Sequence, residues 1–263
     1  MTWRLDIEYD GTPFKGWARQ EDERTVQGEI EAAIGIALGT DQVTLTVAGR
    51  TDAGVHATGQ VASFEFPDPL PDDILRSLNG LTPPEIAINA VTRAPDGFDA
   101  RRDALARSYR YLVLTGGPES PFTRGRAWWV FRKLDRELLD RSAALVVGEH
   151  DFTAFTPPDT YHRRFTRKIE SAEWVAPTPG DARPDLPSGP GAQLLEFRVT
   201  GDSFMRNMVR ILVGTMVEVA SGRRELEEFA GLLEGMPRVE AGVTAPAHGL
   251  YLTGVRYREP AGS

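Results

Sequence analysis

The chain has 263 residues, 41% of them hydrophobic and 26% charged, which is the composition of a folded globular protein and excludes disorder as its overall state. It contains no cysteine, which excludes disulfides, thiolate metal ligands and a cysteine nucleophile. Its 38 acidic and 30 basic residues give a net charge of −8, which disfavours nonspecific coating of nucleic acid but allows a local basic site. Since no apolar stretch reaches the length of a membrane span and no export signal is present, we expect a cytoplasmic protein.

The first half of the chain has the hydrophobic periodicity of a β-α-β-β-α-β unit. Residues 3–9 alternate between apolar and polar side chains, as in a half-buried strand. Residues 25–38 have helical spacing, with Thr25 as the N-cap and Gly39 after the last turn. The remaining elements are predicted as strands at 43–47, 61–66 and 86–91 and a helix at 72–80.

The second half repeats this order with one added helix. Strands are predicted at 109–114, 168–175, 194–199 and 251–257, and helices at 134–147, 203–220 and 224–233. The repeated order is that of the ferredoxin-like fold, in which helices cover one face of an antiparallel sheet. RNA-recognition modules share this architecture and bind bases on the free face. We therefore expect an α+β protein whose halves meet near residues 100–106, with a loop in the Pro- and Gly-rich segment 177–191.

A glycine-rich segment between two predicted strands, residues 48–60, contains the residue types of a catalytic loop. Arg50, Asp52 and His56 supply a guanidinium, a carboxylate and an imidazole. The length and glycine content exceed those of an ordinary hairpin turn, although a simple turn and a structural histidine also fit these residues. The four histidines of the chain have no metal-ligand spacing, so we expect no metal site.

The predicted helix 203–220 is apolar on nearly its whole circumference, which is typical of a buried helix. Arg210 lies on one of its apolar sides. Because a buried guanidinium without a partner is unfavourable, Arg210 needs a carboxylate or a phosphate, unless its side chain extends to solvent. Asp52 is a candidate for that carboxylate.

Two short segments concentrate basic side chains in this acidic chain. Residues 101–110 contain arginines on both sides of Tyr109, among them Arg107, and residues 163–168 begin with Arg163 and Arg164. Arginine interleaved with aromatic residues suits looped RNA, in which bases stack and phosphates pair with basic groups. A solvated charged surface is the alternative interpretation.

The glycine-rich segment, AGRTDAGVHATGQV, strongly resembles the catalytic motif of the tRNA pseudouridine synthase A family. The resemblance extends over nearly the whole chain, because further segments match the family in order: EYDGTPFKGWARQ, TVQGEIEAAI, FDARRDALARSYRY, GEHDFTAF, FMRNMVRILVG and HGLYL. The sequence departs from the family at Arg206 and Asn207, where an aromatic or histidine pair is often found, and in a longer loop at 177–191. Neither departure touches the residues expected to be catalytic.

This resemblance implies an isomerase that converts uridine to pseudouridine at positions 38, 39 or 40 of the tRNA anticodon stem-loop. It implies a homodimer without a cofactor, and two ferredoxin-like subdomains whose antiparallel sheets join and whose cleft holds the site. We expect these subdomains at residues 1–104 and 105–263.

The resemblance also implies roles for individual residues. Asp52 would be the essential aspartate, Arg210 its ion-pair partner and Arg50 a residue that positions the RNA. Tyr109 would pack on the target base. In addition, the basic segment predicts that Arg163 and Arg164 bind the RNA.

The residue types suit this chemistry, because isomerisation of uridine conserves all atoms and needs an ionised carboxylate rather than a redox cofactor. Asp52 can attack the sugar as a nucleophile or remove a ribose proton as a base, and the sequence leaves both routes open. A non-catalytic RNA-binding protein with two RNA-recognition halves is the alternative, but such a protein has no need for the 48–60 loop. A glycosidase would require two carboxylates, and this loop supplies one.

Overall fold

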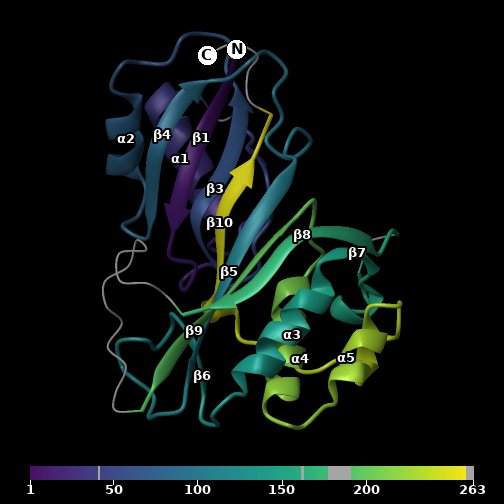
Figure 1. The fold of residues 1–263 in the computed structure, drawn as a ribbon. Helices are drawn as coiled ribbons and strands as arrows, with labels where there is room; N and C mark the ends of the chain where they lie inside the picture. Colours follow the sequence, from purple (N-terminus) through teal and green to yellow (C-terminus); the bar gives the residue numbers. More distant parts are fainter. Residues whose placement is uncertain (41, 161–162, 177–190, 259–263) are drawn as a thin grey trace. The chain divides into compact units, whose positions relative to one another are not determined.

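A computed structural model describes residues 1–40, 42–160, 163–176 and 191–258. The contacts between residues divide the chain into two compact units, drawn in Figure 1. The first unit comprises Met1–Arg107 together with the chain from Tyr251 onward, and the second comprises Ser108–Leu250. This division differs from the expected subdomains chiefly because the last strand belongs to the first unit. The loop predicted at 177–191 lies outside the described residues, apart from Gly191.

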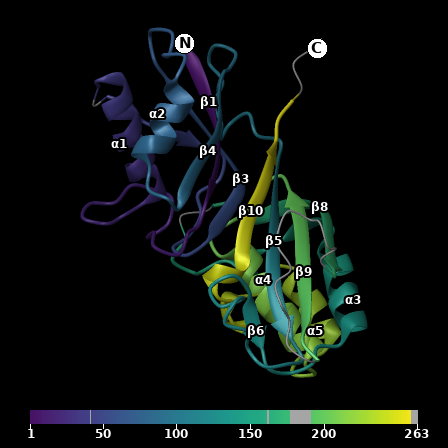
Figure 2. The same ribbon diagram turned by 90° about the vertical axis from the view of Figure 1, so that its left-hand side faces the viewer.

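The first unit is a sheet with helices on one face, and its elements follow the predicted order (Figure 2). They are β1 (Thr2–Tyr9), α1 (Val26–Leu38), β2 (Thr46–Val47), β3 (His56–Glu65), α2 (Ile74–Leu81) and β4 (Ile86–Arg93). β1 lies between β4 and β3 and pairs antiparallel with both. Alternate residues of β1, such as Leu5 and Ile7, are buried, as the period of two predicts.

Strand β10 (Leu250–Arg256) pairs parallel with β3, at His56 and Ala57. The sheet of the first unit is therefore mixed rather than purely antiparallel, and the strand expected to close the second half lies in the first. The short length of β2 leaves room on β3 for this parallel pairing. β2 covers only Ala62 and Ser63 on β3, so the other end of β3 can take a second partner.

Helix α1 forms where the sequence predicts it, because its ends are capped by nearby residues. The hydroxyl of Thr25 accepts the amide of Gly28, and Gly39 follows the helix in the left-handed region with a φ of 65°. Helix α2 is bound to β4 through Asn79, whose side chain hydrogen-bonds both backbone groups of Ile88 at 2.8 and 2.9 Å. Asn79 thus fixes α2 on β4, the strand that pairs with β1.

The second unit is also a sheet with helices on one face (Figure 1), and it has more strands than predicted. Its sheet has the order β5-β9-β8-β7, with β6 beside β5. The strands are β5 (Ala106–Thr115), β6 (Trp128–Val130), β7 (Gly148–Asp151), β8 (Thr166–Val175) and β9 (Gln193–Gly201). The helices are α3 (Arg136–Val146), α4 (Met208–Ala220) and α5 (Leu226–Leu232), with 3-10 turns at Thr153–Phe155, Arg238–Glu240 and Ala247–Gly249. β6 and β7 escaped prediction because they are too short to show a period.

Helix α4 confirms the predicted buried helix but begins at Met208 rather than at residue 203. All of its residues except Arg210 and Glu218 are buried. The helix begins late because the preceding residue, Asn207, has a left-handed backbone with a φ of 61°. Neither α4 nor any other helix in the described part of the chain is long and apolar enough to cross a membrane.

Candidate active site

The loop that carries Asp52 is bound along its backbone by an earlier loop, which follows β1. The amide of Trp17 donates to the carbonyl oxygen of Thr51 at 3.0 Å, and the amide of Gly54 donates to that of Phe14 at 3.4 Å. Within the Asp52 loop, the amide of Val55 donates to the carbonyl oxygen of Asp52 at 3.1 Å. Hydrogen bonds therefore hold the backbone on both sides of the aspartate.

Glycines let these two loops approach each other closely. A Cβ atom on Gly11 would lie 2.0 Å from the carbonyl oxygen of Val55, so no side chain fits there. Gly16 has a φ of 96°, and a Cβ atom on it would lie 2.8 Å from the carbonyl oxygen of Thr51. The sequence reasoning missed this support. The signal was present in the segment EYDGTPFKGWARQ, where both glycines occur.

A small network of buried polar side chains forms hydrogen bonds with the loop. The hydroxyls of Tyr9 and Thr51 are 2.7 Å apart, and the side-chain amide of Gln60 donates to the carbonyl oxygen of Gly49 at 2.8 Å and to the Tyr9 oxygen at 3.4 Å. Burial raises the pKa of Tyr9 to about 12, against weaker opposing hydrogen bonds from Thr51 and Gln60. The Tyr9 hydroxyl is therefore protonated at neutral pH and can serve as a donor.

Asp52 itself is partly exposed, although Thr51 before it is buried, and Arg50 is exposed. At the start of the loop, the guanidinium of Arg107 donates to the carbonyl oxygen of Ala48 at 2.9 and 3.1 Å. From the sequence, Arg107 was grouped with arginines that suit RNA binding. The structure shows that its guanidinium forms hydrogen bonds with the backbone of the loop. A fixed backbone that carries a partly exposed carboxylate can present that carboxylate to a substrate in a defined position.

His56 lies at the end of the loop and is buried, with 1% of its surface exposed. Its Nδ1 atom accepts the amide of Gly11 at 3.0 Å and lies 3.1 Å from the carboxylate of Asp10, and its ring stacks on Tyr251 at 4.6 Å. These contacts favour the structural interpretation of His56 that the sequence left open. Across the described residues, no three His, Asp or Glu side chains are grouped as metal ligands would be.

In the second unit, Tyr109 lies on β5 and is largely buried, with 9% of its surface exposed. Its ring meets Phe204 edge-on, at 4.9 Å between centroids and 72° between planes. The neighbouring hydroxyl of Ser108 is 2.9 Å from that of Thr200 on β9. The ring of Tyr109 is thus supported from one side by Phe204, which comes just before α4.

Arg210 on α4 is half-buried, and two neutral oxygen atoms bind its guanidinium. Its Nε donates to the carbonyl oxygen of Ala245 at 2.7 Å, and its Nη1 donates to Oδ1 of Asn207 at 2.8 Å. The charge of Arg210 also affects His248. Burial lowers the pKa of His248, and a backbone hydrogen bond with Ala127 opposes this effect. The positive charge of Arg210 lowers the pKa further. Asp52 and Arg210 lie in different units, so their pairing stays a prediction.

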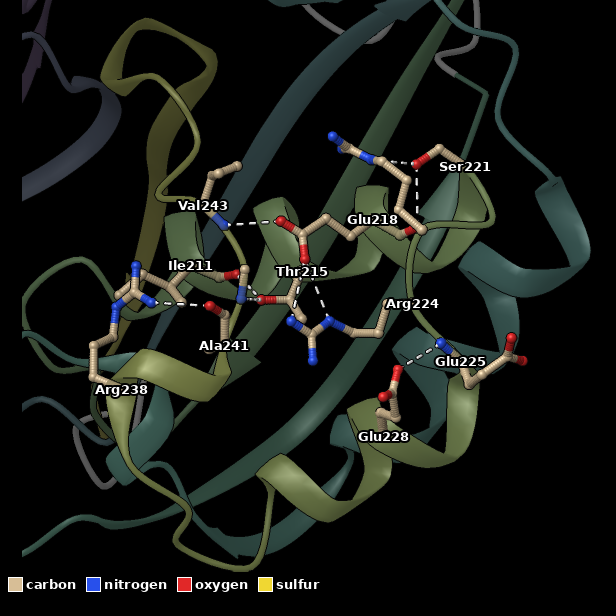
Figure 3. A network of polar contacts seen from close by, with 12 residues as sticks. Ile211, Thr215, Glu218, Ser221, Arg224, Glu225, Glu228, Arg238, Ala241 and Val243 are labelled. Carbon is tan, nitrogen blue, oxygen red and sulfur yellow. Dashed lines mark hydrogen bonds and ion pairs between the residues drawn. The ribbon is translucent and has the colours of Figure 1, made fainter.

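The segment that contains Ala245 is fastened to α4 by the polar network in Figure 3. The hydroxyl of Thr215 accepts a hydrogen bond from the amide of Gly242 at 3.1 Å. The carboxylate of Glu218 accepts a hydrogen bond from the amide of Val243 at 3.2 Å and forms an ion pair with Arg224 at 3.3 Å. Just before these residues in the chain, Arg238 donates to the carbonyl oxygen of Ala241 at 3.2 Å. The carbonyl group that binds Arg210 is therefore part of a fixed surface, and Glu218, the second unburied position of α4, helps to fix it.

Arg163 and Arg164 are exposed in the chain just before β8. Arg167 beneath them is buried, and its Nη1 donates to the carbonyl oxygens of Arg164 and Thr166 at 2.8 and 2.7 Å. Burial lowers the pKa of Arg167, and the charge of Asp202 partly offsets that effect. Arg167 thus supports the backbone of this segment, whereas Arg163 and Arg164 are available to a partner molecule.

Comparison with known proteins first defines a class. A family model described as tRNA pseudouridine synthase matches residues 7–101 and 143–258, which is most of the chain. The matched residues include the Asp52 loop with the glycines that support it, and helix α4 with Arg210. The class is that of the pseudouridine synthases, which are isomerases that modify RNA.

Individual relatives then specify the family. A tRNA pseudouridine synthase A of Myxococcus xanthus is 40% identical over 257 residues, covering 97% of this chain and 92% of that protein. Proteins of the same name from Leptospira biflexa serovar Patoc and Bacillus pumilus are 37% and 38% identical, each covering 98% of this chain and 94% and 99% of the relative. The chain therefore belongs to the tRNA pseudouridine synthase A family.

Proposed function

We propose that this enzyme converts uridine to pseudouridine at positions 38, 39 or 40 of the tRNA anticodon stem-loop, with Asp52 as its essential catalytic residue and no cofactor. The observation that carries this proposal is the Asp52 loop. The loop after β1 binds its backbone, and the side chains of Tyr9 and Gln60 form hydrogen bonds with it. The carboxylate of Asp52 is partly exposed. A tRNA substrate also leads us to expect the enzyme in the cytoplasm.

The reaction breaks the N1–C1′ glycosidic bond, turns the uracil and forms a C5–C1′ bond. N1 gains a proton and C5 loses one, so atoms and electrons balance without an external oxidant or reductant. Asp52 can take part as a nucleophile at the sugar or as a base that removes a ribose proton, and both routes require its carboxylate to be ionised. An amide at this position would support neither route.

The target base must leave the helical stack before a carboxylate can reach its sugar. In our proposal Tyr109, whose ring Phe204 supports, contacts the extruded base and replaces part of the lost stacking. Arg210 meets the carboxylate of Asp52, and the exposed Arg50 orients the RNA. Each of these roles suits the residue type, because a guanidinium binds carboxylates and phosphates in defined geometry.

The remaining contacts with tRNA involve Arg163 and Arg164 and a second copy of the chain. Two exposed arginines next to each other suit the phosphates of a stem-loop. We propose a homodimer in which one tRNA contacts both subunits, as the resemblance to the family leads us to expect. Sedimentation at working concentration tests this part of the proposal, and a monomer throughout would contradict it.

Release of tritium from tRNA labelled at C5 of uridine tests the central proposal, because only the isomerase displaces that hydrogen without cutting the RNA chain. We expect release by the parent protein and none by Asp52→Asn. The variant keeps the shape of the side chain, so its melting temperature and tRNA affinity should stay near those of the parent.

Asp6→Asn is the matched control, since Asp6 lies in the same unit, on β1, where it pairs with Arg4 at 2.6 Å. This control should release tritium at the parent rate. Appreciable release by Asp52→Asn would remove the catalytic role from Asp52. Binding of tRNA by the parent without any release would instead favour a non-catalytic RNA-binding protein.

A further inference from the structure

We propose that Asn207 is a positioning residue for this reaction: its left-handed turn and its side-chain oxygen together set the guanidinium of Arg210 and bring Phe204 against Tyr109. The inference rests on the proposed function, which gives Arg210 and Tyr109 their roles.

The backbone of Asn207 is unusual. Its φ of 61° is positive, and among the described non-glycine residues only Asp22, with a φ of 60°, shares this feature. Asparagine tolerates the left-handed region better than most residues, but glycine tolerates it best. A strained backbone that the surrounding structure maintains is more frequent at functional sites than elsewhere. The presence of Asn rather than Gly therefore points to a use for the side chain.

The turn at Asn207 redirects the chain between two residues of the proposed site. After it, α4 runs directly, with the amide of Ile211 donating to the carbonyl oxygen of Asn207 at 2.9 Å. Before it, the chain leaves the helix axis, and Phe204 packs edge-on against Tyr109 at 4.9 Å. A helix continuous from residue 203, as the hydrophobic pattern alone predicts, would send Phe204 in another direction.

The side chain of Asn207 supplies one of two fixed points for Arg210. Oδ1 of Asn207 accepts from Nη1 at 2.8 Å, while the carbonyl oxygen of Ala245 accepts from Nε at 2.7 Å. Two acceptors on different nitrogens restrain both the position and the plane of a guanidinium, and the loss of either one weakens that restraint. The network of Figure 3 holds the Ala245 segment on α4, so Asn207 completes a frame that is otherwise rigid.

Both acceptors are neutral, which matters for the proposed role of Arg210. A carboxylate at either place would neutralise the guanidinium, but an amide oxygen and a peptide oxygen orient it and leave its positive charge for a catalytic carboxylate or a phosphate. The asparagine thus fixes the direction of the charge without reducing it.

The variant Asn207→Gly tests whether the side chain of Asn207 is needed or whether the residue only permits the left-handed turn. Glycine adopts the same left-handed backbone and removes only the side chain. We expect a melting temperature near that of the parent, because relief of the left-handed backbone offsets part of the lost hydrogen bond. The kcat for tritium release should fall by about tenfold, the order expected for losing a hydrogen bond to a charged group. KM should change little, since the tRNA contacts remain. Asp22→Gly is the control for a glycine at the other left-handed position, and it should leave kcat unchanged.

A double variant shows whether Asn207 acts through Arg210. Under single-turnover conditions, Asn207→Gly should lower the rate of the parent but not that of Arg210→Met, because the group it positions is then absent. Parent values of kcat and KM for Asn207→Gly would overturn the inference, and so would an equal loss in both backgrounds. Full activity of Arg210→Met would instead show that the proposed role of Arg210 is wrong.

Discussion

The hydroxyl group of Tyr9 joins the sheet of the first unit to the Asp52 loop, through its contact with Thr51 at 2.7 Å. Tyr9→Phe keeps the ring and removes this contact, which leaves the buried Thr51 hydroxyl without that partner. We expect the free energy of unfolding to fall by about 1–2 kcal/mol. We also expect a lower kcat at nearly unchanged KM, measured by tritium release. A parent-like kcat would show that Tyr9 supports the fold but not the loop.

The pKa of Tyr9 adds a prediction of pH dependence to this variant. Burial raises that pKa from the ordinary value of 10.0 to about 12 in the folded state, so the folded protein holds this proton more firmly than the unfolded chain does. The resulting stabilisation is complete below about pH 10 and is lost as the pH rises towards about 12. Urea unfolding should therefore show a smaller loss of stability for Tyr9→Phe than for the parent across this range. Equal losses would contradict the assignment.

The predicted pairing of Asp52 with Arg210 can be tested by a thermodynamic cycle. We expect Arg210→Met to destabilise the protein, because it strands a carboxylate and also releases the Ala245 carbonyl oxygen. With Asp52→Asn, the stranded charge is gone, so the double variant should be less destabilised than the two single losses added together. A coupling of about 1–3 kcal/mol is expected for residues in contact. Additive losses measured by urea unfolding would show that the two side chains do not meet, and would favour an RNA phosphate as the partner of Arg210.

At the scale of the element, the loop after β1 supports the Asp52 loop, and a substitution of Gly16 tests this support. Gly16→Ala combines a φ of 96° with a Cβ atom 2.8 Å from the Thr51 carbonyl oxygen. We expect it to shift the loop and lower kcat on the order of a hundredfold, as a displacement of about 1 Å at a catalytic group can do. Gly39→Ala is the matched control, since Gly39 has a φ of 65° but open space around it. It should cost about 1–2 kcal/mol of stability without lowering kcat. Similar kcat values for the two variants would contradict the support that we assign to Gly16.

The elements also show why part of the structure could be predicted from sequence. Helix α1 was predictable because its signals, Thr25 and Gly39, are local. Helix α4 was predictable as a buried helix, but its start was not, because asparagine is only one of several residues that tolerate a left-handed turn. The parallel partner of β10 could not be read from periodicity, which reports the face of a strand and not its neighbour.

The same distinction applies to the candidate site. The residue types of the loop made Asp52 a candidate, and the resemblance to the family gave it the expected role of essential aspartate, which stays a prediction. Its supports, Gly11 and Gly16, were not found, because their contacts join residues about 40 positions apart. The contact of Arg107 was not predicted for the same reason: only the structure shows that its guanidinium binds the carbonyl oxygen of Ala48.

At the scale of the whole molecule, recognition of tRNA by an acidic protein must depend on a few well-placed cations. Replacing both Arg163 and Arg164 with Ala should weaken tRNA binding and reduce the slope of log affinity against log salt by about 1–2, if both contact phosphates. Replacing the exposed Arg76 and Arg93 with Ala makes the same change of charge on α2 and β4, and it should alter the slope less. An unchanged slope for the first pair, measured by filter binding between low and physiological salt, would mean that these arginines face away from RNA.

The return of strand β10 to the first unit has a consequence for the order of folding during synthesis. Residues 1–107 leave the ribosome first, yet the start of β3, at His56 and Ala57, lacks its parallel partner β10 until the whole second unit has been made. Because His56 ends the Asp52 loop and stacks on Tyr251, the nascent first unit has an unfinished strand edge next to this loop. The strand pairing at the start of β3 can therefore be completed only after the second unit has emerged from the ribosome.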